Sequence, residues 1–329
     1  MRFHSDIRRG GFIAVLCFLS LGSVHADFQK IKVVTTLFPL TDWVRVIGGD
    51  AVEVHQLLPP GVEAHAYAPR PSDLLELNRA RVFIYMGSDM EPWADRLISE
   101  TDSTRLLRVE AGRNVARKDA QGEADPESDD RHGAEGHPDA DSHPHKGTDP
   151  HIWLDPVLAQ QIVLEIATAL GQVAPECKDR FSAAAEAYNQ KLQTLHKAIE
   201  EGLTPLRHRE ILYGGHFTFG YFARRYHLSH ASPYPGFSPN ATPTPAGLAD
   251  MIRKLKISGQ TTLFHEELLD PRVARVLAEE TGAKLQVLHG AHNLSRDELA
   301  RGDVTYLSIM YENLSRLRDA LGAANESSD

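Results

Sequence analysis

Four histidines of this chain could do chemistry together, because predicted strand ends and one proline-bracketed loop place them along a single edge. They are His65, His151, His216 and His289. Neutral imidazole is a common zinc ligand, and four nitrogen or oxygen donors in a tetrahedron complete a closed zinc site. The four residues therefore predict a metal site.

Three further residues near these positions could complete or support such a site. His292 lies three residues after His289 in "HGAHNLS" and could replace it as a ligand or support it. Glu63, two residues before His65, and Glu266, at the end of a predicted strand, are carboxylates that could ligate the metal or orient an imidazole. The sequence leaves these alternatives open.

Residues 118–149 lose all apolar periodicity and are rich in acidic side chains, glycine, proline and histidine. This composition predicts a disordered insertion. Its four histidines could collect metal weakly, although a merely solubilising loop is the alternative. They are His132, His137, His143 and His145.

Catalytic signatures are weak in this sequence. "HEELLD" at 265–270 starts like a zinc-protease motif, but Leu269 occupies the position of the second histidine. The chain has neither G-x-S-x-G nor G-x-x-x-x-G-K. Its net charge of -10 argues against nucleic acid as a partner and suits the attraction of cations. We therefore expect a binding protein, not an enzyme, and a monomer.

The elements that must position the histidines alternate between strand and helix in both halves of the chain, which predicts parallel sheets covered by helices. We expect an N-terminal α/β lobe over residues 27–174 and a C-terminal α/β lobe over 205–329. In open parallel sheets, ligands bind beyond the carboxyl ends of the strands. The metal is then expected between the lobes.

One long helix over residues 175–204 should join the lobes. Its apolar residues recur at alternating steps of four and three, which predicts one continuously buried face. In the first lobe, we expect a strand that ends at Pro39 and a helix that Thr41 opens as a capping residue.

The first 26 residues predict a secretory signal peptide. Arg8 and Arg9 precede the apolar run "GFIAVLCFLSLG", and small residues follow before Asp27. We favour cleavage after Ala26 and a periplasmic product over a lipid anchor at Cys17, because Val15 and Leu16 precede that cysteine instead of small residues.

Several motifs together resemble the cluster A-I zinc and manganese solute-binding proteins of bacterial ABC importers. They are "VVTTLFPLTDWVRVIGGD", "LLPPGVEAHAYAPRPSDL", "MEPW", "DPHIWLDP", "GGHFTFGYFARRY" and "YLSIMYENL". The resemblance runs from about residue 31 to 321. It implies two α/β lobes joined by one rigid helix, and an ABC permease as the partner.

The resemblance also implies a ligand set. The family's ligands fall on His65, His151 and His216, and its fourth position, commonly Asp, is occupied here by His289. An all-imidazole shell favours zinc over manganese, while copper and nickel also bind nitrogen ligands strongly. The expected function is the capture of zinc for import, with affinity falling below about pH 6.5. The alternatives are a periplasmic zinc buffer or metallochaperone, a manganese-binding importer component, and a zinc hydrolase.

Overall fold

The computed structural model describes residues 30–101, 104–113, 115, 149–235 and 241–322. The predicted signal segment, with Cys17, lies outside these ranges, as do His132, His137, His143 and His145 of the predicted insertion.

The N-terminal lobe is built on a four-stranded parallel sheet with the order β2-β1-β3-β4. Its strands are β1 (Ile31–Thr35), β2 (Val52–Gln56), β3 (Val82–Tyr85) and β4 (Leu107–Glu110). Its helices are α1 (Phe38–Gly48), α2 (Pro71–Arg79), α3 (Ala94–Ser99) and α5 (Pro156–Val173), with the short 3-10 turns η1 (Gly49–Ala51) and η2 (Ile152–Leu154).

Successive side chains of a strand point to opposite faces of the sheet, so each face packs against its own helices. Val82 and Ile84 of β3 pack into the core cluster that contains α1 and α5, while Phe83 and Tyr85 pack into the one that contains α2 and α3. The side chains of β3 are buried on both faces. This is the pattern expected for a central parallel strand.

The C-terminal lobe contains two parallel strand pairs. Its strands are β5 (Glu210–Leu212), β6 (Ser229–Ala231), β7 (Thr262–His265) and β8 (Lys284–Val287). β5 pairs with β6 and β7 with β8, and a bridge between Tyr213 and Phe264 brings the two pairs together. Its helices are α7 (Gly220–Arg225), α8 (Pro245–Ser258), α9 (Arg272–Thr281), α10 (Arg296–Arg301) and α11 (Tyr306–Leu321).

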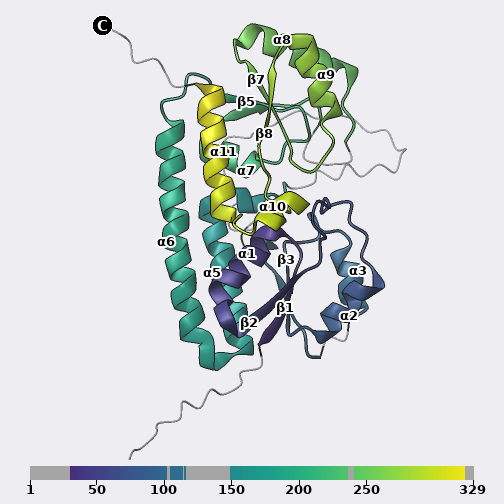
Figure 1. The fold of residues 1–329 in the computed structure, drawn as a ribbon, viewed down its shortest axis with the longest axis vertical. Coiled ribbons are helices and arrows are strands. Elements are labelled where there is room, and N and C mark those ends of the chain that lie inside the picture. Colours follow the sequence, from purple (N-terminus) through teal and green to yellow (C-terminus); the bar gives the residue numbers. More distant parts are fainter. Residues whose placement is uncertain (1–29, 102–103, 114, 116–148, 236–240, 323–329) are drawn as a thin grey trace, which may run out of the picture.

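Helix α6 (Lys178–Leu203) follows the 3-10 turn η3 (Pro175–Cys177) and runs alongside both lobes (Figure 1). Its 26 residues correspond to about 39 Å at 1.5 Å per residue. The predicted apolar stripe is buried and packs against α1, α5 and α11. The expected fold class, two α/β lobes bridged by one long helix, is confirmed.

The start of α1 differs from the sequence expectation. The helix begins at Phe38, so Pro39 lies in its first turn, where its missing N–H costs no hydrogen bond. Thr41 is inside the helix instead of capping it, and its hydroxyl oxygen lies 3.1 Å from the carbonyl oxygen of Leu37. Pro39 therefore opens a helix and does not end a strand.

Helix α5 is the one described helix that is long and apolar enough to cross a membrane. However, 56% of that span is buried inside the protein, as in the core helix of a globular fold.

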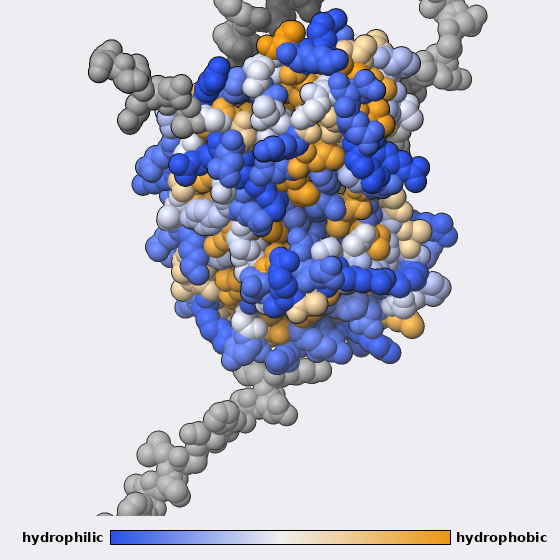
Figure 2. All heavy atoms as spheres, turned by 45° about the horizontal axis from the view of Figure 1, so that its top comes forward, coloured by the Kyte–Doolittle hydropathy of each residue, from blue (hydrophilic) through white to orange (hydrophobic). Residues whose placement is uncertain are grey.

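On the face in Figure 2, hydrophobic residues form small areas between hydrophilic ones.

Candidate metal centre

Three of the predicted ligands, from loops in both lobes, come together. His65 follows β2, His151 precedes η2, and His216 follows β5. Their ligand atoms all lie within 4.8 Å of one another, with ring centroids 5.7 to 6.3 Å apart. His151 is completely buried and His216 is 4% exposed. We call these three residues the histidine cluster.

Each imidazole of the histidine cluster has a buried Nε2 atom that finds no hydrogen-bond partner among the described residues. Buried polar atoms are nearly always paired, because an unpaired one costs about 1–3 kcal/mol. Three such atoms in one cluster are costly unless they bind something. A metal cation supplies what they lack, because it accepts the lone pair of each nitrogen.

Carboxylates hold the opposite nitrogen of two of these rings. Nδ1 of His151 lies 2.7 Å from Oδ1 of Asp149, and Nδ1 of His216 lies 3.4 Å from Oε1 of Glu266. A carboxylate that accepts from Nδ1–H leaves the lone pair on Nε2 and fixes the direction of the ring. Burial raises the pKa of Asp149 to about 7, and a cation at the neighbouring ring favours its charged form.

The chain around His151 is fixed by the residue that caps α5. Oδ1 of Asp155 accepts from the backbone N–H of Val157 at 2.8 Å, which satisfies the first turn of the helix. Oδ2 of the same carboxylate accepts from Nε of Arg225 in α7 at 2.7 Å. The His151 loop is thereby tied to the helix that follows the His216 loop.

Two glycines let the His216 loop approach its neighbours. A Cβ on Gly214 would lie 2.8 Å from the Cα of Ala274 in α9. A Cβ on Gly215 would collide with the carboxylate of Glu266, the partner of the His216 ring. The glycines therefore make it possible for Glu266 to orient His216.

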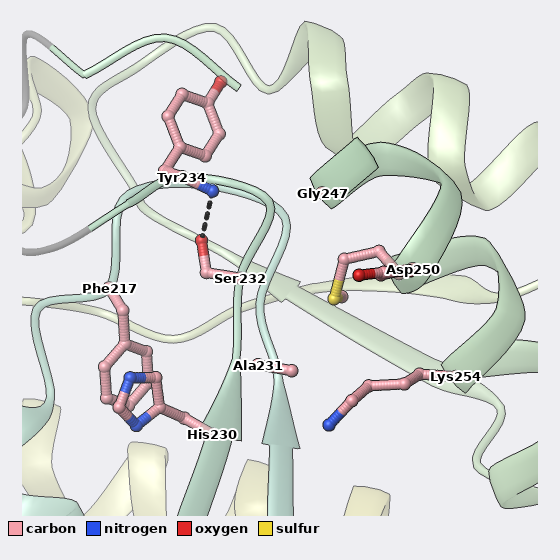
Figure 3. A pocket seen from close by; sticks show the side chains of 9 residues that line it. Phe217, His230, Ala231, Ser232, Tyr234, Gly247, Asp250 and Lys254 are labelled. Carbon is pink, nitrogen blue, oxygen red and sulfur yellow. Dashed lines mark hydrogen bonds between the residues drawn. The ribbon is translucent and has the colours of Figure 1, made fainter. Parts of the chain in front are cut away.

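A surface pocket of about 430 Å³ lies between β6 and α8 on the C-terminal lobe (Figure 3). At its wall, the ring of Phe217 stacks on His230 with centroids 3.8 Å apart and planes at 5°. The pocket lining includes none of the histidine cluster. The pocket adjoins the centre only through Phe217, the residue after His216.

His292 shows the same features as the histidine cluster and lies beside it. Its ring centroid is 5.2 Å from that of His151 and 5.3 Å from that of Trp153. Nδ1 lies 3.5 Å from Oε1 of Glu267, while the buried Nε2 has no hydrogen-bond partner among the described residues. The Glu267 carboxylate at Nδ1 and the short distance to His151 make His292 a candidate fourth donor, beside the three histidines whose ligand atoms lie within 4.8 Å of one another.

The structure does not bring His289 into the histidine cluster. Its Nδ1 lies 3.4 Å from Oε1 of Glu267 and its Nε2 3.3 Å from Oε1 of Glu298. Burial lowers the pKa of His289, but the two carboxylates outweigh it and the pKa is raised. The pKa of Glu298 falls to about 2, chiefly through its hydrogen bond to His289. Nδ1 of His289 also accepts from the backbone N–H of Ala291 at 2.9 Å, so its neighbours hold this ring between buried Glu267 and half-buried Glu298.

The two other carboxylates named from the sequence lie close to the centre in different roles. Oε2 of Glu63 accepts from the backbone N–H of Ala66 at 3.0 Å, so this side chain shapes the turn that carries His65. Glu266 stands behind the His216 ring. The sequence reasoning missed Asp149 and Glu267 as partners of histidines. Asp149 was signalled by its position two residues before His151, whereas nothing local pointed to Glu267.

Burial makes His65 and His151 poor proton acceptors. The pKa of His65 is lowered to about 4, mainly by burial and further by the neighbouring imidazoles, although Glu63 opposes the shift. Burial lowers the pKa of His151 well below its ordinary value. Both rings are therefore neutral at pH 7, as metal ligation requires.

This shift predicts a low titration midpoint for His65. In the metal-free protein, we expect the NMR signal of the His65 ring to titrate near pH 4 instead of 6.5. Since the unfolded chain takes up this proton at about pH 6.5, the metal-free protein should lose stability as the pH falls from 6.5 toward 4. Protons should therefore begin to compete with the metal for His65 at a lower pH than the value of about 6.5 expected from the sequence. A midpoint between 6 and 7 would contradict the burial of this ring.

Comparisons with known proteins agree with this geometry. A family profile described as zinc-uptake complex component A, periplasmic, matches residues 33–320. The high-affinity zinc uptake system protein ZnuA of Bacillus subtilis (strain 168) is 31% identical over 321 residues, which cover 95% of this chain and 97% of that protein.

The zinc-binding lipoprotein AdcA of Streptococcus pneumoniae (strain R6) is 31% identical over 309 residues, or 93% of this chain. The match covers 59% of AdcA, so the chain spans about three fifths of the length of this relative. The crystal structure of the Zn(II)-bound ZnuA-like domain of S. pneumoniae AdcA superposes with a TM-score of 0.69 at 28% identity, covering 89% of this chain and 99% of that domain.

Proposed function

Because the chain belongs to the family of periplasmic A components of zinc-uptake complexes, we propose that it captures one zinc ion and delivers it to the permease of an ABC importer. The observation that carries this proposal is the histidine cluster: its ligand atoms lie within 4.8 Å of one another, and its three buried Nε2 atoms have no hydrogen-bond partner in the part of the chain that the structure describes. Zinc is the cargo.

We propose that His65, His151 and His216 ligate the ion and that His292 supplies the fourth nitrogen. Four imidazoles suit the tetrahedral geometry and borderline softness of zinc, while manganese prefers oxygen donors. The carboxylates behind three of the rings, Asp149, Glu266 and Glu267, orient them and increase their basicity. Copper and nickel could occupy the same nitrogen shell, so metal availability contributes to selectivity.

Capture and release follow from the origin of the ligands. His65 and His151 belong to the N-terminal lobe, and His216 and His292 to the C-terminal lobe. A small displacement of one lobe's loops would therefore break half of the ligand shell without a wide hinge motion. The length and burial of α6 favour such a local release over a large closure. Contact with the permease would bias the loops toward release.

We place the protein outside the cytoplasm, in line with its family. We further propose a periplasmic product cleaved near Ala26, with a lipid anchor at Cys17 as the alternative, since AdcA is named a lipoprotein. The intact mass of the exported protein distinguishes the two forms, because an anchored one begins at Cys17 and carries acyl chains.

Deleting residues 118–148 should leave the affinity for one zinc ion unchanged within about threefold. The deletion stops before Asp149, because that residue holds the His151 ring. The reason is that the proposed ligands lie elsewhere, while the deleted histidines offer weak additional binding. Calorimetric titration measures both the stoichiometry and the dissociation constant. A loss of the tight ion with this segment would favour a zinc buffer that uses the insertion as its main site.

A further inference from the structure

Asn293, the residue after the proposed ligand His292, joins the two lobes. It is 1% exposed and its side chain uses every hydrogen-bonding position it has. Nδ2 donates to the carbonyl oxygens of Pro59 at 2.6 Å and Val62 at 3.0 Å. Oδ1 accepts from Nε2 of Gln56 at 2.8 Å and from the backbone N–H of Leu294 at 2.9 Å.

The two carbonyls bound by Asn293 belong to the turn that leads to His65. Gly61 in this turn has a φ of +80°, which favours glycine. Its N–H donates to the carbonyl oxygen of Leu294 at 2.8 Å. Two groups of the C-terminal lobe thus hold the turn: the side chain of Asn293 and the carbonyl oxygen of Leu294.

The segment that contains Asn293 also contacts the chain near the other ligands. The carbonyl oxygen of Gly290 accepts from Nε1 of Trp153 at 2.9 Å, two residues from His151. The carbonyl oxygen of His292 accepts from the N–H of Phe38 at 3.0 Å. One short stretch therefore connects the loops that carry three of the four proposed ligands.

We propose that Asn293 is a positioning residue that sets the His65 imidazole relative to His151 and His292 and so determines how tightly zinc is held. This inference rests on the proposed function. A metal site requires its ligands to be held within about 0.5 Å of the productive geometry. His65 is less buried than the other two members of the histidine cluster, so its turn depends on external support.

Only an amide fits the demands of this position. Aspartate keeps an acceptor for Gln56 but cannot donate, and its charge would face two carbonyl oxygens. Gln56 has a fixed orientation, because its Oε1 accepts from Thr41 at 3.0 Å and its Nε2 also donates to Leu58. The pattern of donors and acceptors around Asn293 is therefore complementary to a side-chain amide and not to a carboxylate.

The test compares Asn293→Ala and Asn293→Asp with the matched variants Asn189→Ala and Asn189→Asp. Asn189 also donates from its side chain to a backbone oxygen, that of Gln160 at 3.2 Å, but it joins α6 to α5 away from the ligand loops. Zinc affinity and zinc dissociation are measured with a competing chelator at a temperature where every variant is folded, and melting temperatures are recorded beside them.

We expect both Asn293 variants to bind zinc about tenfold more weakly or worse, the scale found when supports of metal ligands are removed. Zinc should dissociate correspondingly faster, and the amide of Gly61 should exchange hydrogen faster in the metal-free protein. The Asn189 variants should keep the parent affinity even where their melting temperature falls. Gln56→Ala, which removes one of the four bonds, should show a smaller loss in the same direction and serves if the Asn293 variants do not fold.

Asn293 variants that melt at lower temperature but bind zinc as tightly as the parent would overturn the proposal, because the residue would then serve stability alone. If the parent itself bound no zinc, the proposed function would fail and this inference with it. The two failures are therefore distinguished by the parent titration.

Discussion

Replacing His65 and His151 together by alanine is expected to abolish tight zinc binding. A four-ligand zinc site is worth about 12 kcal/mol, or about 3 kcal/mol for each ligand if shared evenly. Losing two ligands then weakens binding on the order of ten-thousandfold. Both rings have a buried Nε2 without a hydrogen-bond partner among the described residues, so no other role explains their convergence. Calorimetric titration with and without a competing chelator measures the loss.

The matched control is the double variant His55→Ala, His208→Ala. It removes the same number of imidazoles from positions outside the histidine cluster, and His55 is exposed on the strand that leads toward His65. Its affinity should equal that of the parent. If the His65, His151 double variant still bound one ion as tightly as the parent, the histidine cluster would not be the capture site.

The second large effect distinguishes His292 from His289. We expect His292→Ala to weaken zinc binding about a hundredfold, since it removes one ligand of about 3 kcal/mol. His289→Ala should change the affinity much less, because its Nδ1 accepts from the N–H of Ala291 at 2.9 Å and its Nε2 lies 3.3 Å from Oε1 of Glu298. Parallel titrations of the two variants make the comparison.

His289→Ala should instead reduce the stability of the metal-free protein. The pKa of His289 is raised in the folded state, so its contribution is complete below about pH 6.5 and is lost as the pH rises through the folded pKa. The stability difference between parent and variant should therefore be larger at pH 6 than at pH 9 in denaturant unfolding. Should His289→Ala lose zinc while His292→Ala retains it, His289 would be the fourth ligand.

The choice between these two histidines shows where sequence reasoning reached its limit. The alternation of strands and helices predicted both lobes, and the apolar stripe predicted α6. After β8, however, Ala291 adopts a left-handed φ of 57°, which is rare for a residue with a side chain. The next residue is His292, whose ring centroid lies 5.2 Å from that of His151. No pattern in "HGAHNLS" predicts this backbone conformation.

The sequence also could not predict the hydrogen-bond partners that come from distant loops. Glu267 supports His292 across 25 residues, and Asn293 reaches the turn at Pro59 across 234. Such contacts depend on how the lobes pack, which local periodicity does not encode. Strand ends, by contrast, have a local signature, and parallel sheets bring their carboxyl ends to one edge. For this reason, three clustered histidines could be named from the sequence and their supports could not.

Anomalous diffraction at the zinc edge, from crystals of the zinc-loaded protein, tests the central claim most directly. We predict one strong peak about 2.0–2.2 Å from Nε2 of His65, His151 and His216, with Nε2 of His292 as the fourth donor. A peak between His289, Glu267 and Glu298, or bound zinc with no peak at the histidine cluster, would contradict the account.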